Sequence, residues 1–466
     1  MINPLMFREY DIRGIAGQDL TAAAVTQIGQ VFAAILRQHS GGKDRLTVAV
    51  GRDGRLSSPE LAAALIEGIR REGVHVVDIG LAPTPALYFA THHLESDAGI
   101  MVTGSHNPPD YNGLKMVRHH QAVYGQEIQA IYQRLLSPPA AATQGIGQLH
   151  QVDILPAYME RLTRGFRPGR PLRVVVDCGN GATGVVVPTL MQQLPLVSSE
   201  ILFAEVDGTF PNHHPDPTLP ENLVALKQRM MATGADLGIA FDGDGDRIGA
   251  LDPQGNIIWG DRLMILFATD LLRERPGATV IGDVKCSQLL FDAVAAAGGQ
   301  PLMWKTGHSL IKAKMRETGA LLAGEMSGHL FFSDRYLGYD DGLYAAVRLI
   351  ELAAASSTSL TEQLAQLPEV HATPELRLHC ADDVKFQVME RIAAEQRRVA
   401  DKKISDIDGI RVQSADGWWL LRVSNTQPAL VARVEAYSAA GLQRLTAELA
   451  AALQQEGIAF TANASH

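Results

Sequence analysis

The chain has 466 residues, of which 46% are hydrophobic and 20% are charged, and its formal net charge is -10 at pH 7. This length exceeds what one hydrophobic core supports, so we expect a globular protein of several domains rather than a disordered chain. The negative charge disfavours binding to nucleic acid or to an anionic membrane. No apolar run reaches the roughly 18 residues of a spanning helix, and the charged residues from Arg8 onward do not fit a secretory signal. We therefore expect a cytoplasmic protein.

The three cysteines, Cys178, Cys286 and Cys380, lie far apart in the sequence and form no paired spacing. Neither a disulfide framework nor a zinc site is indicated by this arrangement. We expect all three to be reduced residues of the core.

The first 150 residues alternate between predicted strands and helices. β-Branched and apolar runs, with a capping serine between them, predict a strand at 47–51, a helix at 57–71, and strands at 74–78 and 98–102. The first and the last of these strands lead into polar loops, Arg52-Asp53-Gly54-Arg55 and Thr103-Gly104-Ser105-His106-Asn107-Pro108. A charged aromatic segment at 7–14 precedes the first helix.

The same order of elements recurs twice along the chain. The second copy has predicted elements at 172–176, 186–194, 200–204 and 235–241, and the third has them at 279–282, 287–297, 301–304 and 320–323. Each copy ends in a polar loop that contains glycine, Asp242–Arg247 in the second and Gly324–His329 in the third. Parallel-type sheets place functional loops at the carboxyl ends of their strands, so we expect the three loops to converge on one cleft.

The pattern changes from about Glu369, where an alternating run at 375–379, a predicted helix at 386–401 and a predicted strand at 418–422 indicate an α+β domain. The predicted fold class is therefore α/β with four domains, of which three are related α/β modules and the last is C-terminal. We place these domains at 1–150, 151–254, 255–368 and 369–466. The Ala/Pro/Gly-rich stretch 138–147 marks the first boundary, and 356–359 is expected to join two helices within the third module.

The loop that follows the strand at 98–102 offers the hydroxyl of Ser105 at a strand end. Gly104 permits a tight turn there, and Asn107-Pro108 prevents a helix from forming. His106 and Lys115 can place hydrogen-bond donors and positive charge near the hydroxyl. The loop is suited to carry a phosphoryl group, but an ordinary Gly/Asn/Pro surface turn explains the same residues equally well.

Asp242, Asp244 and Asp246 alternate with glycines and predict a site for one small hard cation, for which Mg²⁺ is the expected occupant. An EF-hand is excluded because the sixth position is Arg247 and the twelfth is Pro253. Three carboxylates this close repel each other without a cation, which favours a metal site over a solvated acidic turn. Arg247 beside this site can hold a phosphate.

Two later loops offer donors that suit a phosphorylated sugar. Glu325 and Ser327 can hydrogen-bond vicinal hydroxyls, and His329 can act as an acid or a base. The loop Arg422-Val423-Ser424-Asn425-Thr426-Gln427-Pro428 offers a guanidinium, hydroxyls and an amide to a dianionic phosphate. A structural turn is the alternative for each loop.

One motif points to a different class of enzyme. Gly179-Asn180-Gly181-Ala182-Thr183-Gly184 matches the dinucleotide fingerprint, and Glu200 and Glu205 follow near the position of a ribose-binding acid. A nicotinamide oxidoreductase would leave the serine loop, the aspartates and the C-terminal donor loop without a role, so we reject it. The sequence also contains no P-loop, which disfavours a P-loop kinase.

Five motifs in order resemble the α-D-phosphohexomutases, and specifically their bacterial phosphomannomutase/phosphoglucomutase branch. These motifs are Tyr10-Asp11-Ile12-Arg13-Gly14, Thr103–Pro108, Asp242–Arg247, Gly324–His329 and Arg422–Thr426. The resemblance covers nearly the whole chain and implies a heart-shaped enzyme of four domains with mixed sheets, whose C-terminal domain closes over the substrate. It also implies that Ser105 is the phosphoserine, and that Asp242, Asp244 and Asp246 hold Mg²⁺ together with an oxygen of its phosphate.

The resemblance assigns the remaining site residues to two groups. The catalytic group around the transferring phosphoryl is Lys115, His106, Arg13 and Arg247, with Lys115 as the preferred proton-transfer partner and His329 as a second candidate. The substrate-binding group is Tyr10, Lys285, His308, Glu325 and Ser327, with Arg422, Ser424, Asn425 and Thr426 at the phosphate that does not react.

The implied reaction interconverts the 1-phosphate and the 6-phosphate of glucose, mannose or both, through a phosphoserine enzyme and a 1,6-bisphosphate. Expected cofactors are one Mg²⁺ per chain and glucose 1,6-bisphosphate as activator and intermediate. Phosphoglucosamine mutase is the alternative activity, although Met326 resembles the phosphomannomutase/phosphoglucomutase branch, and a non-catalytic sugar-phosphate-binding homologue is a further alternative. We expect hexose phosphates as the only partners, no nucleic acid or membrane, and a monomer, with a dimer as the alternative state.

Overall fold

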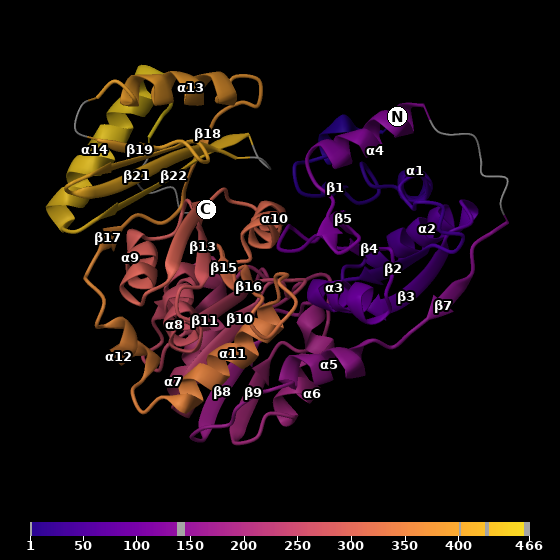
Figure 1. Ribbon diagram of the computed structural model, residues 1–466, viewed down its shortest axis with the longest axis horizontal. Helices are drawn as coiled ribbons and strands as arrows, with labels where there is room; N and C mark the ends of the chain where they lie inside the picture. Colours follow the sequence, from indigo (N-terminus) through magenta and orange to yellow (C-terminus); the bar gives the residue numbers. More distant parts are fainter. Residues whose placement is uncertain (1, 138–144, 400–401, 425–427, 461–466) are drawn as a thin grey trace.

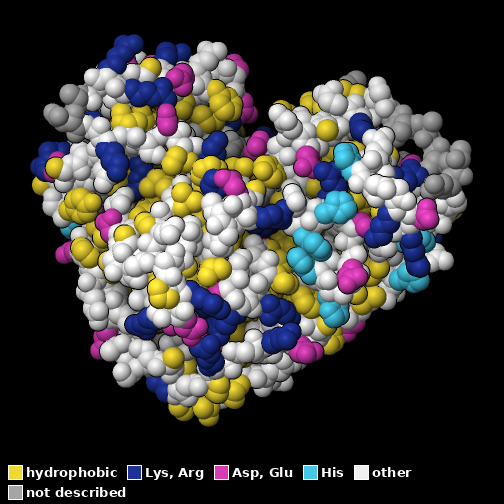
Figure 2. Space-filling model, in the orientation of Figure 1, with side chains coloured by type: hydrophobic (Ala, Val, Ile, Leu, Met, Phe, Trp, Pro, Cys, Tyr) yellow, Lys and Arg dark blue, Asp and Glu magenta, His cyan; other side chains and the backbone are white. Residues whose placement is uncertain are grey.

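The computed structural model describes residues 2–137, 145–399, 402–424 and 428–460. Within these residues the strands form four sheets, which we number I to IV in chain order. Sheet IV and its helices form one lobe and sheet I forms another, while sheets II and III lie between and below them (Figure 1). The space-filling view is heart-shaped, with a hollow between the two lobes (Figure 2).

Sheet I combines four parallel strands with antiparallel strands at one edge. Its strands run in the order β1-β5-β4-β2-β3-β7, and β6 pairs with β5. They are β1 (Ile12–Ile15), β2 (Thr47–Arg52), β3 (His75–Leu81), β4 (Ala98–Val102), β5 (Tyr111–Arg118), β6 (Gln121–Ala122) and β7 (Leu149–Gln151). The helices of this segment are η1 (Pro4–Met6), α1 (Ala22–Gln38), α2 (Ser58–Arg71), α3 (Thr84–His93) and α4 (Gln126–Leu136).

Sheets II and III are built from the next two stretches of the chain. Sheet II holds β8 (Leu172–Asp177), β9 (Val197–Leu202), β10 (Leu237–Phe241), β11 (Ile248–Leu251) and β12 (Ile257–Ile258), with α5 (Leu155–Thr163), η2 (Ala182–Val185), α6 (Val187–Gln192), η3 (Pro220–Leu223) and α7 (Val224–Thr233). Sheet III holds β13 (Thr279–Asp283), β14 (Gln300–Trp304), β15 (Leu322–Gly324) and β16 (Leu330–Phe332), with α8 (Gly260–Glu274), α9 (Gln288–Ala296), α10 (His308–Thr318), α11 (Gly342–Ala355) and α12 (Leu360–Leu364).

The predicted repeat is confirmed by the strand order of these three sheets. Sheet I contains the order β3-β2-β4-β5, sheet II β9-β8-β10-β11, and sheet III β14-β13-β15-β16. In each sheet the first three of these strands are parallel and the fourth is antiparallel. The polar loop of each copy joins the third strand to the fourth, so the three loops have equivalent positions.

Sheet IV is antiparallel throughout and differs from the other three, as the sequence predicts. Its strands are β17 (His371–Ala372), β18 (Leu376–His379), β19 (Lys403–Ser405), β20 (Ile410–Ser414), β21 (Gly417–Val423) and β22 (Ala429–Ala436), and its helices are α13 (Lys385–Gln396) and α14 (Ala439–Gln455). The helix expected at 386–401 is therefore shorter, although 400–401 lie outside the described residues. The expected strand at 200–204 begins earlier, at Val197.

Buried apolar residues form one large core that continues from sheet I through sheets II and III, and separate cores under the outer face of sheet I and within sheet IV. The three cysteines are buried and free, as predicted. The segment 356–359 joins α11 to α12, which confirms the expected helix-to-helix loop. Among the described residues, none of the helices combines the length and apolarity needed to span a membrane.

Candidate active site

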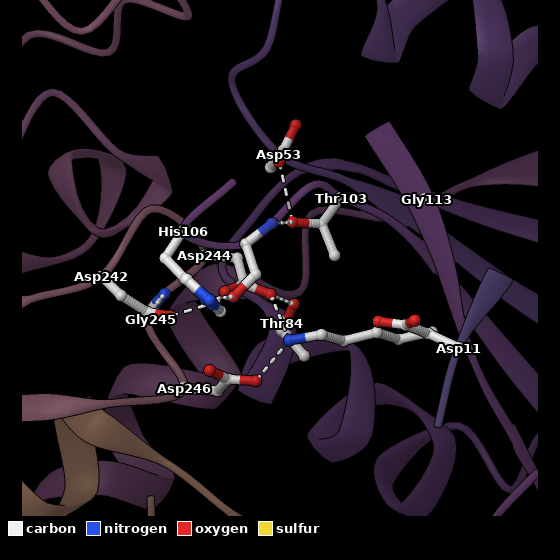
Figure 3. A network of polar contacts seen from close by, with 12 residues as sticks. Asp11, Asp53, Thr84, Thr103, His106, Gly113, Asp242, Asp244, Gly245 and Asp246 are labelled. Carbon is white, nitrogen blue, oxygen red and sulfur yellow. Dashed lines mark hydrogen bonds and ion pairs between the residues drawn. The ribbon is translucent and has the colours of Figure 1, made fainter. Parts of the chain in front are cut away.

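Ser105, in the loop after β4, contacts Asp242 in the loop after β10. Figure 3 labels its neighbour His106 beside Asp242 at this junction. Its hydroxyl donates to Asp242 Oδ2 at 3.1 Å and lies 3.2 Å from His106 Nδ1. The side chain is buried, and the backbone is in the left-handed region at φ +50°. A residue with a side chain adopts that conformation at an energetic cost, so the surrounding structure must hold the turn in place.

Asp242, Asp244 and Asp246 are fully buried, and they offer carboxylate oxygens that lie within 4.8 Å of one another. Backbone N–H groups of Gly245 and Arg247 both donate to Asp242 Oδ1. Oδ1 of Asp244 and Oδ1 of Asp246 are buried and have no hydrogen-bond partner among the described residues. Unsatisfied carboxylate oxygens of this kind are suitable ligands for Mg²⁺, so the residues fit the predicted metal.

The electrostatics of this group also indicate a cation site. Burial raises the pKa of Asp242 well above its ordinary value, and the charges of Asp246 and Asp244 raise it further. Three ionised carboxylates cannot share a dry site unless positive charge compensates them. Lys115 supplies part of that charge from β5, with its Nζ 2.8 Å from Asp244 Oδ2 and 2.5 Å from Asp246 Oδ2.

Lys115 lies on β5 (Tyr111–Arg118), a strand for which the sequence analysis made no prediction. Burial favours the neutral amine, yet the neighbouring Asp244 and Asp246 outweigh that effect and raise the pKa of Lys115. Thr84, at the start of α3, was also missed, and its hydroxyl donates to Asp244 Oδ2 at 2.5 Å. The sequence offers no signal for Thr84, because 160 residues separate it from its partner.

Arg247 and His329 join the second loop to the third. Their main chains form an isolated antiparallel bridge, and Arg247 Nε donates to His329 Nε2 at 2.9 Å. Because Nε2 accepts this bond, the ring proton resides on Nδ1, which faces Asp340 Oδ2 at 3.1 Å. Asp340 was not predicted, although two adjacent acids just before α11 are a visible signal.

Asp340 is also the acidic partner of Lys312 and of the predicted substrate-binding residue His308. Its Oδ1 accepts from Lys312 Nζ at 2.8 Å, and its Oδ2 lies 3.5 Å from His308 Nδ1. The rings of His308 and His329 stack with centroids 5.5 Å apart. Burial lowers the pKa of His308 well below its ordinary value, and the charge of Lys312 lowers it further. His308 is therefore neutral at physiological pH.

Glu325 and Ser327 lie together in the loop after β15. Glu325 Oε1 accepts from the Gly307 N–H at 3.1 Å, and the Ser327 hydroxyl donates to Glu325 Oε2 at 3.2 Å. Burial raises the pKa of Glu325, with the charge of His329 acting in the opposite direction. Tyr10 reaches the same region, where its hydroxyl donates to the Thr306 carbonyl at 2.9 Å.

The predicted phosphate-binding cations are paired with acids of the C-terminal segment. Lys285 Nζ lies 2.9 Å from Glu375 Oε2, and Arg422 Nε donates to Asp408 Oδ2 at the same distance. Ser424 donates its backbone N–H to Ala429. The predicted ligands Asn425 and Thr426 lie outside the described residues.

Arg13 extends the site on the side of sheet I. Its Nη2 lies 2.5 Å from Asp11 Oδ2, and its Nη1 donates to the Asn107 side chain in the serine loop. The catalytic residues named from the sequence are therefore drawn from the ends of sheets I, II and III, around one group of carboxylates.

The glycine-rich run 179–184 packs against the second loop rather than opening a long helix. A Cβ at Gly181 would lie 2.8 Å from the Gly243 carbonyl, and one at Gly184 would lie 2.0 Å from the Ala204 carbonyl. The N–H of Ala182 donates to the same Gly243 carbonyl. Close backbone packing under the aspartate loop explains these glycines, without a dinucleotide.

Four family models match consecutive parts of the chain. They are the phosphoglucomutase/phosphomannomutase alpha/beta/alpha domain I over 4–140, domain II over 156–255, domain III over 259–371 and the C-terminal domain over 375–452.

Individual relatives agree with these models. The chain is 47% identical over 440 residues to a phosphomannomutase/phosphoglucomutase of Pseudomonas aeruginosa, covering 94% of this chain and 93% of the relative. It is 44% identical over 441 residues to a phosphoglucomutase of Neisseria gonorrhoeae, covering 94% and 95%. The crystal structure of a phosphoglucomutase/phosphomannomutase family protein from Burkholderia thailandensis superposes with a TM-score of 0.91 at 45% identity, covering 99% of this chain and all of that one.

Proposed function

The chain belongs to the phosphoglucomutase/phosphomannomutase family and is a hexose-phosphate mutase, and we propose that Ser105 carries the phosphoryl group that it transfers. The observation that carries this proposal is the contact of the Ser105 hydroxyl with Asp242, inside a buried group of three carboxylates. Lys115 completes the group as its cation.

The proposed reaction has two phosphoryl transfers. In the first, the bond between phosphorus and Ser105 Oγ breaks while phosphorus bonds to the oxygen of the free hydroxyl of a hexose 1- or 6-phosphate. That hydroxyl loses its proton to the enzyme, and the seryl oxygen gains one. The resulting 1,6-bisphosphate turns end for end, and its other phosphoryl group returns to Ser105. Asp242, Asp244 and Asp246 would hold Mg²⁺, and the bound ion would supply positive charge that neutralises the transferring phosphoryl group.

We propose that Lys115 exchanges the proton of the transfer. Its raised pKa keeps it protonated at neutral pH, so it can give a proton to the seryl oxygen as the phosphoryl group leaves and recover it in the reverse step. His329 is the second candidate, and His106, Arg13 and Arg247 complete the positive surroundings of the phosphoryl group. Arg247 donates to His329, so movement of its guanidinium toward phosphate would free the Nε2 lone pair.

Substrate binding would exchange two ion pairs for phosphate contacts. Lys285 and Arg422 are paired with Glu375 and Asp408, and a dianionic phosphate is a stronger partner for both cations. Glu325 and Ser327 would bind the sugar hydroxyls, with Tyr10 and His308 beside them, and Ser424, Asn425 and Thr426 would bind the same phosphate as Arg422. A generic phosphate cradle of this kind accepts either end of a bisphosphate.

Phosphorus NMR tests the substrate class directly. Purified protein with Mg²⁺ and a trace of glucose 1,6-bisphosphate is offered glucose 1-phosphate, mannose 1-phosphate or glucosamine 1-phosphate in separate tubes. Growth of a 6-phosphate signal with the first two supports the proposed glucose and mannose specificity. A preference for the third moves the assignment to phosphoglucosamine mutase, and silence in all three supports a sugar-phosphate-binding protein.

Phosphopeptide mass spectrometry tests the proposed carrier. After incubation with glucose 1,6-bisphosphate, the phosphate should map to Ser105, and Ser105→Ala should lose both the label and turnover while it still binds sugar phosphate. Ser96→Ala is a matched control, because Ser96 is also buried but its hydroxyl has no hydrogen-bond partner among the described residues. A label at another serine would contradict the proposal.

A further inference from the structure

Arg55 ends the polar loop after β2. Its side chain lies beneath the loop that contains Ser105 and is only 1% exposed. Its guanidinium donates to four main-chain carbonyls of that neighbouring segment. Nη2 binds the carbonyls of Ser105 at 2.8 Å and Asn107 at 2.6 Å, and Nη1 binds those of Pro108 at 2.5 Å and Tyr111 at 2.9 Å. A planar group with five donors is therefore almost fully used to bind one backbone turn.

Asp53 binds the same turn from its other end. Its Oδ2 accepts from the Thr103 hydroxyl at 2.8 Å and from the Gly104 N–H at 3.2 Å, and it lies 3.3 Å from Arg55 Nε. The Thr103 hydroxyl in turn accepts from the N–H of Ser105 at 2.9 Å. Figure 3 shows this connection from Asp53 through Thr103 toward the carboxylates. Both backbone polar groups of Ser105 are thus bound, directly or through one hydroxyl, by the Arg55–Asp53 pair.

Contacts with the second module fix the position of Arg55 itself. The ring of Phe210 lies 5.3 Å from the guanidinium carbon, within the range of a cation–π contact. On the other side of the turn, a Cβ at Gly243 would lie 2.5 Å from the Ser105 carbonyl oxygen. The Ser105 peptide is therefore confined between Arg55 and the aspartate loop, which sets the 3.1 Å separation between its hydroxyl and Asp242.

We propose that Arg55 is a positioning residue for phosphoryl transfer, which holds the strained turn at Ser105 so that the seryl oxygen faces Asp242. The inference rests on the proposed function of Ser105 as the phosphoryl carrier. Arg55 does not touch the hydroxyl, and it acts through the main chain of the turn. Its removal changes the rate of transfer, while the binding of the sugar by the third loop and the C-terminal segment stays the same.

Arg55→Lys tests this inference because it keeps the charge but loses the planar fork. One ammonium with three donors cannot bind four separated carbonyls. A displacement of the seryl oxygen of about 1 Å is expected to lower kcat and the single-turnover rate of Ser105 phosphorylation about 100-fold, with KM for the sugar phosphate nearly unchanged. A rise in KM with an unchanged kcat would overturn the inference.

Arg348→Lys is the matched control for general destabilisation. Arg348 is also buried, stacks on the Phe332 ring at 4.9 Å and pairs with Asp334 at 2.9 Å, but it contacts no part of the serine turn. Both variants should melt at a lower temperature than the wild type, and only Arg55→Lys should be phosphorylated slowly. Equal slowing in the two variants would show that the effect is only structural.

Two further outcomes separate this inference from the proposed function. If the wild type takes up no phosphate at Ser105, the proposed carrier is wrong. If the wild type and Arg55→Lys are phosphorylated at Ser105 at equal rates, the carrier stands and the positioning role is wrong. Should Arg55→Lys fail to fold, Phe210→Leu decides, because it removes the ring that packs on the guanidinium and leaves the hydrogen-bonding groups of Arg55 in place. This variant must slow phosphorylation without raising KM, and a wild-type rate refutes the inference.

Discussion

Replacing Lys115 by methionine tests whether the three aspartates form a metal site. Methionine keeps much of the side-chain volume but removes the cation that contacts Asp244 and Asp246 at 2.8 and 2.5 Å. Without Lys115, two fully buried carboxylates lose their ionic partner. The variant should therefore be destabilised when no divalent cation is present, and Mg²⁺ should bind it more tightly than it binds the wild type.

The expected magnitudes follow from the two contacts. Coulomb's law gives roughly 4 kcal/mol for unit charges 4 Å apart at an effective dielectric constant of about 20. Removing one partner of a buried pair leaves the other charge buried and uncompensated, which costs about 3–5 kcal/mol. At about 2 °C per kcal/mol, Tm in a chelator should fall by roughly 6 °C or more. Lys115 repels a bound cation, so its loss should lower the Kd for Mg²⁺ at least about tenfold, or about 1.4 kcal/mol.

Calorimetric titration with Mg²⁺ and thermal melts in chelator and in saturating Mg²⁺ measure both quantities. Mg²⁺ should narrow the difference in Tm between Lys115→Met and the wild type. Mutase activity should stay absent, because the proposed proton-transfer partner is missing. Lys312→Met is the matched control, since Lys312 is also largely buried and pairs with Asp340 outside the aspartate loop. Its difference in Tm should be the same with and without Mg²⁺. Equal affinity of wild type and Lys115→Met for Mg²⁺ would refute the reasoning.

Three further predictions concern other parts of the molecule. Burial raises the pKa of Asp341 to about 7, so between about pH 4 and pH 7 the native state binds a proton that the unfolded chain lacks. The free energy of unfolding of the wild type should therefore fall by about 1.4 kcal/mol per pH unit as pH rises through this range, and its Tm should fall relative to that of Asp341→Asn. Parallel pH profiles of the two proteins would contradict this. Gly307→Ala should raise KM, because its Cβ would lie 2.5 Å from the Tyr10 ring at a backbone φ of +130°. In a double-mutant cycle, Gly307→Ala should raise KM less in a Tyr10→Ala background than in the wild type. Removal of 369–466 should weaken sugar-phosphate binding and leave Mg²⁺ binding intact, because the C-terminal core is separate; an unchanged KM would contradict it.

The repeat and the loops at its strand ends could be predicted because their signals are local. The predicted strands at 98–102 and 235–241 end where polar, glycine-containing loops begin, and the structure has strands at Ala98–Val102 and Leu237–Phe241. The alternating aspartates in the second loop are likewise visible in six consecutive residues. Hydrophobic periodicity and loop chemistry report what a short segment does, whatever lies elsewhere in the chain.

The supporting residues could not be predicted, since their partners are distant in sequence. Thr84 binds Asp244 across 160 residues, and Asp53 and Arg55 bind a turn about 50 residues away. The strand that carries Lys115 was missed because Asn112 and Gly113, which read as turn residues, lie inside it. Their neighbours in the sheet override this local preference, with Gly113 opposite Arg13 and Asn112 opposite Gly14.

The main-chain bridge between Arg247 and His329 constrains how chimeric enzymes can be built from this chain and its relatives. It links two consecutive modules at the site itself, where the Ile248 N–H donates to the Gly328 carbonyl. Swapping either module alone would replace one side of this junction and shift the loop of Glu325 and Ser327 relative to the aspartates. Recombination should therefore exchange the second and third modules as one block.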